Sequence, residues 1–210
     1  MSVRPFAGNV LITAALAVAG CASTSSVRWN PTLDPFKAPA SGPVFVMEPM
    51  VEGTASPGNV GRNFPAGRQE VLARVLSILR EQSAAVDVAG GASHGRNRAL
   101  ASYPAAVGGG GLTTEELDAA NAAFENGAAE LLVPTILEWT EMRTDDPIGI
   151  FTTAHNRIAI DLRLMRLRPP GLAAHAVFRN RARLTLNQSA ARLLDDNFRI
   201  VVLKMVSGRN

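Results

Sequence analysis

The clearest pattern along the chain is an alternation of apolar and polar residues in its C-terminal half. In segment 156–168 the apolar positions are Ile158, Ile160, Leu162 and Leu164, and in segment 174–186 they are Phe178, Ala182, Leu184 and Leu186. A period of two is typical of a strand with one buried face. Because the intervening RPPG segment, 168–171, has the composition of a turn, the pattern predicts a β-hairpin.

Three other segments have the period of an amphipathic helix. Segment 67–82 repeats apolar residues at Val71, Leu72, Val75, Leu76, Ile78 and Leu79. In segment 189–207, Leu194, Phe198, Val201 and Met205 lie on one helical stripe. The third helix is predicted to run to Asn126 and to begin at Thr113, which forms a capping box with Glu116.

Short apolar runs at 43–49 and 85–89, together with segment 130–143, predict three more strands. The resulting order is βαβαβββα, an α+β fold with a mixed or antiparallel sheet and helices packed on one face. We expect residues 43–210 to form one such domain.

The N-terminus has a different pattern, an unbroken apolar or small run over residues 10–19 behind Arg4. This run is about half of the roughly 20 residues that a spanning helix needs. Its position and its small-residue end are typical of a secretory signal. Cys21 follows after Gly20. It is the single cysteine of the chain, so the exported protein would contain no internal disulfide.

The residues Val18, Ala19, Gly20 and Cys21 resemble the lipobox of bacterial lipoproteins. The resemblance implies cleavage after residue 20, a diacylglycerol on the Cys21 sulfur and a further acyl chain, such as palmitate, on its amino group. Two or more chains anchor a protein stably. Ala22 in place of Asp implies the outer membrane, with the domain facing the periplasm. An ordinary signal peptide that ends near a cysteine is the alternative.

Between this cysteine and the domain, segment 21–42 is rich in Ser, Thr and Pro and is interpreted as a flexible, lipid-anchored tether. Trp29 and Phe36 are its exceptions, and they either dock on the domain or lie at the membrane interface. The formal charge of the 210 residues is +3, which argues little about partners. In an exported protein it does not indicate nucleic-acid binding.

No catalytic pattern can be recognised. The Gly-rich segment 90–111 lacks the Gly-Lys-Ser/Thr ending of a phosphate-binding loop, and His94 within it has no visible partner. The acidic group at Glu138, Glu141, Asp145 and Asp146 lacks the spacing of a calcium loop. If the hairpin brings His155 and His175 close together, two histidines are still too few ligands for a structural zinc site. We therefore expect no enzyme activity, cofactor or metal.

A surface is the remaining candidate. In the predicted hairpin five arginines share the polar face, with Asp161 opposing them: Arg157, Arg163, Arg179, Arg181 and Arg183. Guanidinium groups bind carboxylates and phosphates well, so this face is a candidate for an anionic lipid, lipopolysaccharide or an acidic protein patch. A solvated face without a partner is the alternative.

The strand residues Leu132, Val133, Pro134, Ile136 and Trp139, followed by Arg157, Ile158, Ile160 and Leu162, resemble a group of bacterial lipoproteins built on a domain of unknown function. The layout is similar, more weakly, to periplasmic lipoproteins that regulate cell-wall synthases or form secretion channels. We expect a non-catalytic accessory module of the cell envelope, anchored by its acyl chains and bound to an envelope protein. A carrier for a small ligand or lipid is the alternative, and it would need an apolar cavity between sheet and helices.

Overall fold

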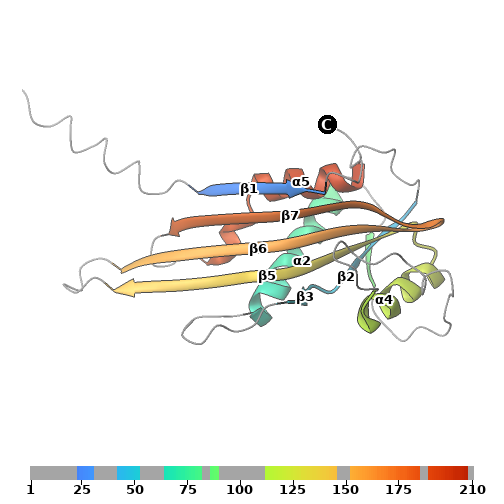
Figure 1. Cartoon of the computed structure of the whole chain (residues 1–210), viewed down its shortest axis with the longest axis horizontal. Helices are drawn as coiled ribbons and strands as arrows, with labels where there is room; N and C mark the ends of the chain where they lie inside the picture. The colour runs from blue at the N-terminus through green and yellow to red at the C-terminus, as the bar shows by residue number, and fades with distance from the viewer. Residues whose placement is uncertain are drawn as a thin grey trace, which may run out of the picture.

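The computed structural model describes residues 23–30, 42–52, 64–81, 86–89, 112–145, 152–184 and 189–207. Within them the chain forms an α+β fold around a seven-stranded mixed sheet, which confirms the predicted fold class (Figure 1). The strands are β1 (Thr24–Trp29), β2 (Val44–Met47), β3 (Met50–Val51), β4 (Val86–Ala89), β5 (Glu130–Asp145), β6 (Thr152–Leu167) and β7 (Pro170–Leu184).

The three long strands β5, β6 and β7 form an antiparallel meander in the middle of the sheet, whose order is β1-β7-β6-β5-β2-β4. β2 lies parallel to both β5 and β4, and the short β3 also pairs with β5. The predicted hairpin is confirmed, with Ile160 opposite Phe178 and Leu162 opposite Ala176. The two alternating apolar sets therefore share one face of the sheet.

The described part of the chain has three α-helices beside the sheet, namely α2 (Phe64–Glu81), α4 (Thr114–Glu125) and α5 (Asp196–Ser207). The predicted capping box of α4 is confirmed: the Glu116 amide donates to Thr113 Oγ1 at 3.2 Å, and the Thr113 amide donates to Glu116 Oε2 at 2.8 Å. This exchange satisfies two amides at the start of the helix.

Segment 189–207, predicted as one helix, is divided into two elements. It begins as the 3₁₀ turn η2 (Ala190–Leu193), and α5 starts only at Asp196. The side chain of Asp195 accepts hydrogen bonds from the amides of Asn197 and Phe198 at 3.0 and 3.2 Å, which makes it the cap of α5. The predicted stripe is nevertheless buried at all four positions.

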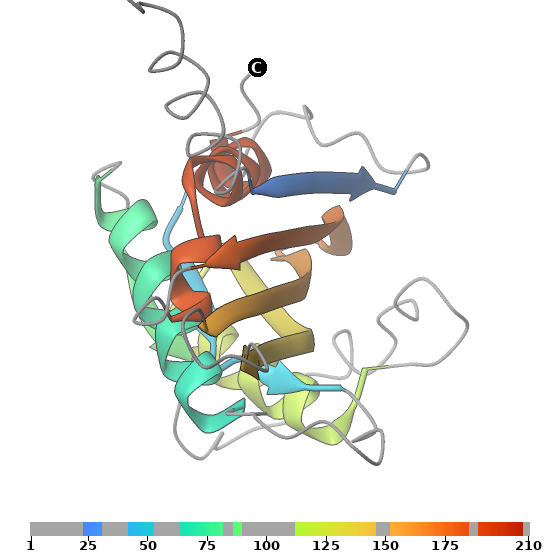
Figure 2. The same ribbon diagram turned by 90° about the vertical axis from the view of Figure 1, so that its left-hand side faces the viewer.

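The core lies on both faces of the sheet, and the helices are divided between them (Figure 2). α2 and α5 pack on the face that carries Ile158, Ile160 and Phe178. α4 packs on the opposite face, against Leu131 and Val133. The expectation of helices on one face therefore holds for α2 and α5 and is wrong for α4. The physical reason is that both faces of β2 and of the start of β5 are apolar.

The N-terminal part of the segment predicted as a tether also differs from the prediction, because it belongs to the sheet. Residues 24–29 form the edge strand β1, which pairs antiparallel with β7 over its full length. Trp29 packs against the core on the α2 and α5 side, which confirms the docked aromatic, and Asn197 Nδ2 donates to Ser25 Oγ at 2.7 Å. An edge strand needs backbone hydrogen bonds on one side only, so a short, polar segment can form one. Phe36 lies outside the described residues.

Candidate functional site

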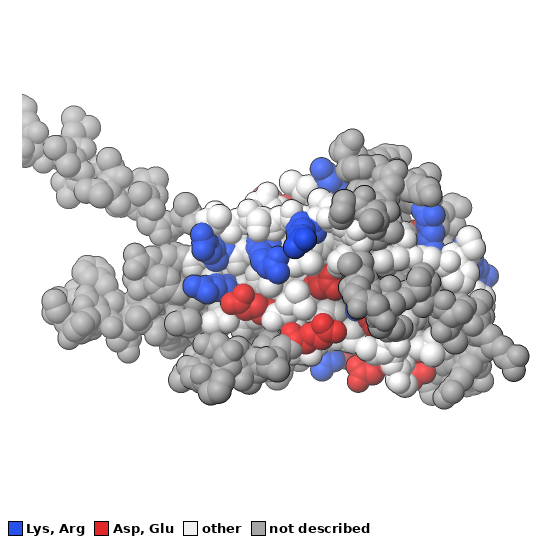
Figure 3. All heavy atoms as spheres, viewed as in Figure 1, with Lys and Arg blue, Asp and Glu red and all other residues white. Residues whose placement is uncertain are grey.

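The sheet face that carries α4 is divided into a covered end and an uncovered end. On this face α4 lies over the start of β5 and the end of β6, whereas no described helix covers the same face at the other end of these strands. In Figure 3 basic side chains gather at this second end, over β1, β6 and β7. The uncovered end is therefore where this face exposes positive charge.

Among the described side chains, this patch contains four exposed arginines, which we call the arginine cluster: Arg28, Arg157, Arg179 and Arg181. Arg157 lies directly opposite Arg181 in the β6–β7 ladder. Like charges in directly opposite positions destabilise a sheet by a few tenths to about 1 kcal/mol. Within the described part of the chain, none of the four guanidinium groups forms an ion pair. The cluster is thus a concentration of positive charge that the described fold does not neutralise.

The cluster borders a shallow hollow of about 290 Å³ on the same face. Its lining includes the hydroxyl-bearing Thr24 and Ser26 of β1, together with Arg157, Arg179 and Arg181. Glu138 of β5 is the one carboxylate in that lining, and the sequence-based description of the face did not include it. A β-bulge after Ile136 shifts the alternation of β5, which local periodicity does not reveal.

The prediction that Arg163 belongs to the exposed arginine face is wrong, because this residue is buried. It is 6% exposed, forms an ion pair with Glu116 of α4, lies 3.5 Å from Asp161 and donates to Thr135 Oγ1 at 3.5 Å. It shares the sheet face with Arg157 but lies at the end that α4 covers. Asp161 therefore faces Arg163 rather than the exposed arginines. The position of Arg183 on β7 is described, opposite His155, but its side chain is not.

Asp161 also contacts His175, with 2.5 Å between Oδ1 and Nε2. Glu116, Arg163, Asp161 and His175 thus form a continuous group of ionisable side chains between α4 and the sheet. All four are largely buried. A buried charge is tolerated when it is paired and hydrogen-bonded, so these contacts account for the burial of the group and join α4 to the sheet.

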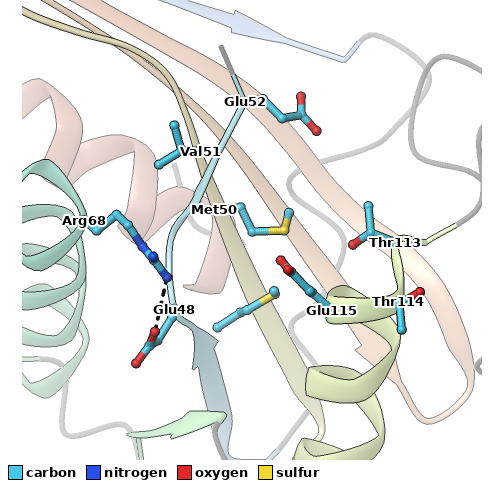
Figure 4. A pocket seen from close by; sticks show the side chains of 9 residues that line it. Glu48, Met50, Val51, Glu52, Arg68, Thr113, Thr114 and Glu115 are labelled. Carbon is cyan, nitrogen blue, oxygen red and sulfur yellow. Dashed lines mark hydrogen bonds and ion pairs between the residues drawn. The ribbon is translucent and has the colours of Figure 1, made fainter. Parts of the chain in front are cut away.

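A second, larger hollow of about 730 Å³ lies between the β2–β3 segment, α2 and the start of α4 (Figure 4). Its polar lining combines Glu48, Glu52, Glu115 and Arg68. Arg68 forms an ion pair with Glu48 at 3.3 Å, and both side chains are exposed. Sequence reasoning missed this hollow because its residues come from segments that are far apart along the chain. Its acidic, open character differs from that of an apolar ligand cavity.

The histidine pair considered for zinc is not brought together. His155 lies opposite Arg183, and His175 lies opposite Arg163, so the two histidines are eight positions apart along β6. Among the described residues no group of three or more His, Cys, Asp or Glu has metal-binding geometry. Several predicted features lie outside the residues or side chains that are described: Val18, Ala19, Gly20, Cys21, His94, segment 90–111, Glu141, Asp145 and Asp146.

No described helix is long and apolar enough to cross a membrane. The chain matches no family model, and no curated protein matches its sequence. Its fold is similar to that of the PelC dodecamer from Paraburkholderia phytofirmans, at 12% identity and a TM-score of 0.52, over 90% of this chain and 100% of that one. Similarity at this level of identity shows a shared fold.

Two further structures are similar to this chain at lower TM-scores. The lipoprotein GNA1162 from Neisseria meningitidis is 12% identical with a TM-score of 0.40, over 79% of this chain and 94% of that one. The protein XCC0632 from Xanthomonas campestris, of the family DUF330, is 12% identical with a TM-score of 0.42, over 89% of this chain and 91% of that one. The structures similar to this chain therefore include a bacterial lipoprotein and a domain of unknown function.

Proposed function

We propose that the protein is a lipid-anchored, non-catalytic accessory module of the bacterial cell envelope that binds other envelope components. The signal peptide that precedes Cys21 directs its export. The acyl chains on Cys21 attach it to the outer membrane on the periplasmic side. Its working part is the folded domain, which presents the arginine cluster on an uncovered sheet face.

The packing between the sheet and its helices is the observation that carries this proposal over a carrier function. Val71, Val75, Ile78 and Leu79 of α2 are 0% exposed against the sheet. Phe198 of α5 is equally buried, and its ring packs edge-on against Phe178 of β7 with centroids 5.2 Å apart. Among the described residues, side chains therefore fill the space between sheet and helices in which a carrier would hold an apolar ligand, and the two hollows given above are open and partly charged.

Association with copies of itself is included in the proposal, since a fold of this kind is found in the PelC dodecamer. A module that assembles in this way would present many arginine clusters on one assembly. Many weak contacts would then act together and strengthen binding to an extended partner.

Lipid labelling combined with crosslinking in cells tests the proposal. The chain should incorporate a palmitate analogue and fractionate with the outer membrane, whereas Cys21→Ser should do neither. A photo-crosslinking residue at Ser26, on the uncovered face, should form adducts with envelope proteins or with the chain itself. The same residue at Glu70, on the exposed side of α2, is the matched control. Equal labelling of Cys21→Ser would refute the anchor, and equal adducts from both positions would refute the binding face.

A further inference from the structure

The position of β1 relates the arginine cluster to the anchor. β1 begins at Thr24, three residues after Cys21 in the sequence, and Thr24 is paired with Arg181. A three-residue segment spans at most about 10 Å, and paired strands lie about 5 Å apart. If Cys21 carries acyl chains in a membrane, the backbone of Arg181 cannot be more than about 15 Å from the acylated residue.

From this geometry we propose that the arginine cluster docks on the phosphate groups of anionic phospholipids in the membrane that holds the Cys21 anchor. The inference rests on the proposed lipid anchoring and adds a second contact to it. Since two or more acyl chains already retain a protein on a membrane, the cluster adds orientation rather than retention. It holds the end of the sheet where β1 begins against the head groups and leaves α4, with the acidic hollow beside it, directed away.

The chemistry of the cluster fits this occupant. Guanidinium groups donate paired hydrogen bonds to phosphate oxygens, and the hydroxyls of Thr24 and Ser26 line the same hollow as Arg179 and Arg181. The volume of about 290 Å³ is at the lower limit of pockets that enclose a drug-sized ligand, so it suits a head group rather than a whole lipid. Attraction to an anionic surface decays within about 8 Å at physiological ionic strength, so the cluster acts only when it lies close to the membrane, and the short connection to Cys21 allows that approach.

Three basic residues elsewhere on the described surface provide a contrast. Arg80, Arg192 and Lys204 belong to α2, η2 and α5, which cover the opposite face of the sheet. They carry the same total charge as Arg157, Arg179 and Arg181. A comparison of the two sets therefore separates the position of charge from its amount.

Vesicle co-sedimentation tests the proposal with residues 21–210 carrying Cys21→Ser, a chain that contains every described element but cannot be acylated. The chain should bind vesicles of equal parts phosphatidylglycerol and phosphatidylcholine, and not vesicles of phosphatidylcholine alone. At about 1 kcal/mol per arginine near an anionic surface, Arg157→Gln, Arg179→Gln and Arg181→Gln together should lower the partition coefficient on the order of 100-fold.

The matched control, Arg80→Gln, Arg192→Gln and Lys204→Gln, should lower binding far less, and thermal unfolding should show that both triple variants remain folded. Glu138→Gln removes the carboxylate from the hollow and should strengthen binding several-fold. Equal losses in the two triple variants, or equal binding to both vesicle types, would overturn the proposal. Because the tested chain has no acyl anchor, such a result would not affect the lipid labelling of Cys21. If that labelling failed instead, the vesicle measurement would still stand as an independent result.

Discussion

Glu116 takes part in two contacts, the capping box of α4 and an ion pair with the sheet. One carboxylate oxygen closes the capping box of α4, and the other forms the ion pair with Arg163 of β6. Arg163 and Arg157 occupy the same face of the same strand, yet the first is buried and the second exposed. The difference arises because α4 covers one end of that face. A buried pair of this kind is sensitive to the loss of either partner.

We expect Arg163→Met to lower the free energy of unfolding by roughly 3–5 kcal/mol, because Glu116 would remain buried as an unpaired charge. Adding Glu116→Gln, which keeps the capping box, should restore most of the loss. Arg157→Met is the control on the same strand and should change stability by at most about 0.5 kcal/mol. Urea unfolding measures all three variants. A double variant less stable than the single one would show that burial of the Glu116 charge is not the cause.

β1 is the element for which the sequence is least informative. Its six residues, TSSVRW, carry too little apolar periodicity to distinguish a strand from a tether. Pairing with β7 and the contact of Trp29 with the core stabilise it in the folded protein. The consequence is that the domain begins almost at the predicted anchor rather than about twenty residues after it.

Trp29→Ala should therefore destabilise the domain by roughly 2 kcal/mol, less than the range for a fully buried tryptophan because Trp29 is half-buried. Arg28→Ala, the neighbouring residue on the other face of β1, should have little effect on stability. Thermal or urea unfolding provides the comparison. If Trp29→Ala proved as stable as the parent chain, residues 24–29 would behave as the tether that their composition suggests.

The whole molecule has a well-packed centre and edges that are paired on one side only. β6 is paired on both sides by long strands, whereas β4 is an edge strand that pairs with β2 over four residues. β1 forms the other edge. The uncovered face of the arginine cluster adjoins this second edge, close to the predicted lipid anchor.

Hydrogen exchange should reproduce this arrangement. We expect the backbone amides of β6 to exchange slowest, at a rate set by global unfolding, and those of β4 to exchange fastest among the strands through local opening. Mass spectrometry of peptides from each strand measures the difference. Equal protection of β4 and β6 would contradict the strand order of the sheet.

The amino-acid sequence determined the parts of the protein whose signals are local. Alternation predicted the β6–β7 hairpin, period and spacing predicted α2, and Thr113 with Glu116 predicted the start of α4, because each depends on residues that are close in the chain. Cys21 likewise stays a prediction from a local motif.

Only the tertiary structure decided which surface is buried and which is free. Nothing near Arg163 in the sequence distinguishes it from Arg157, since its burial results from a helix that precedes it by about forty residues. The strand β1, the bulge that directs Glu138 toward the arginines and the placement of α4 have the same origin. Burial depends on what packs against a residue from elsewhere in the chain, and the local pattern contains no such information.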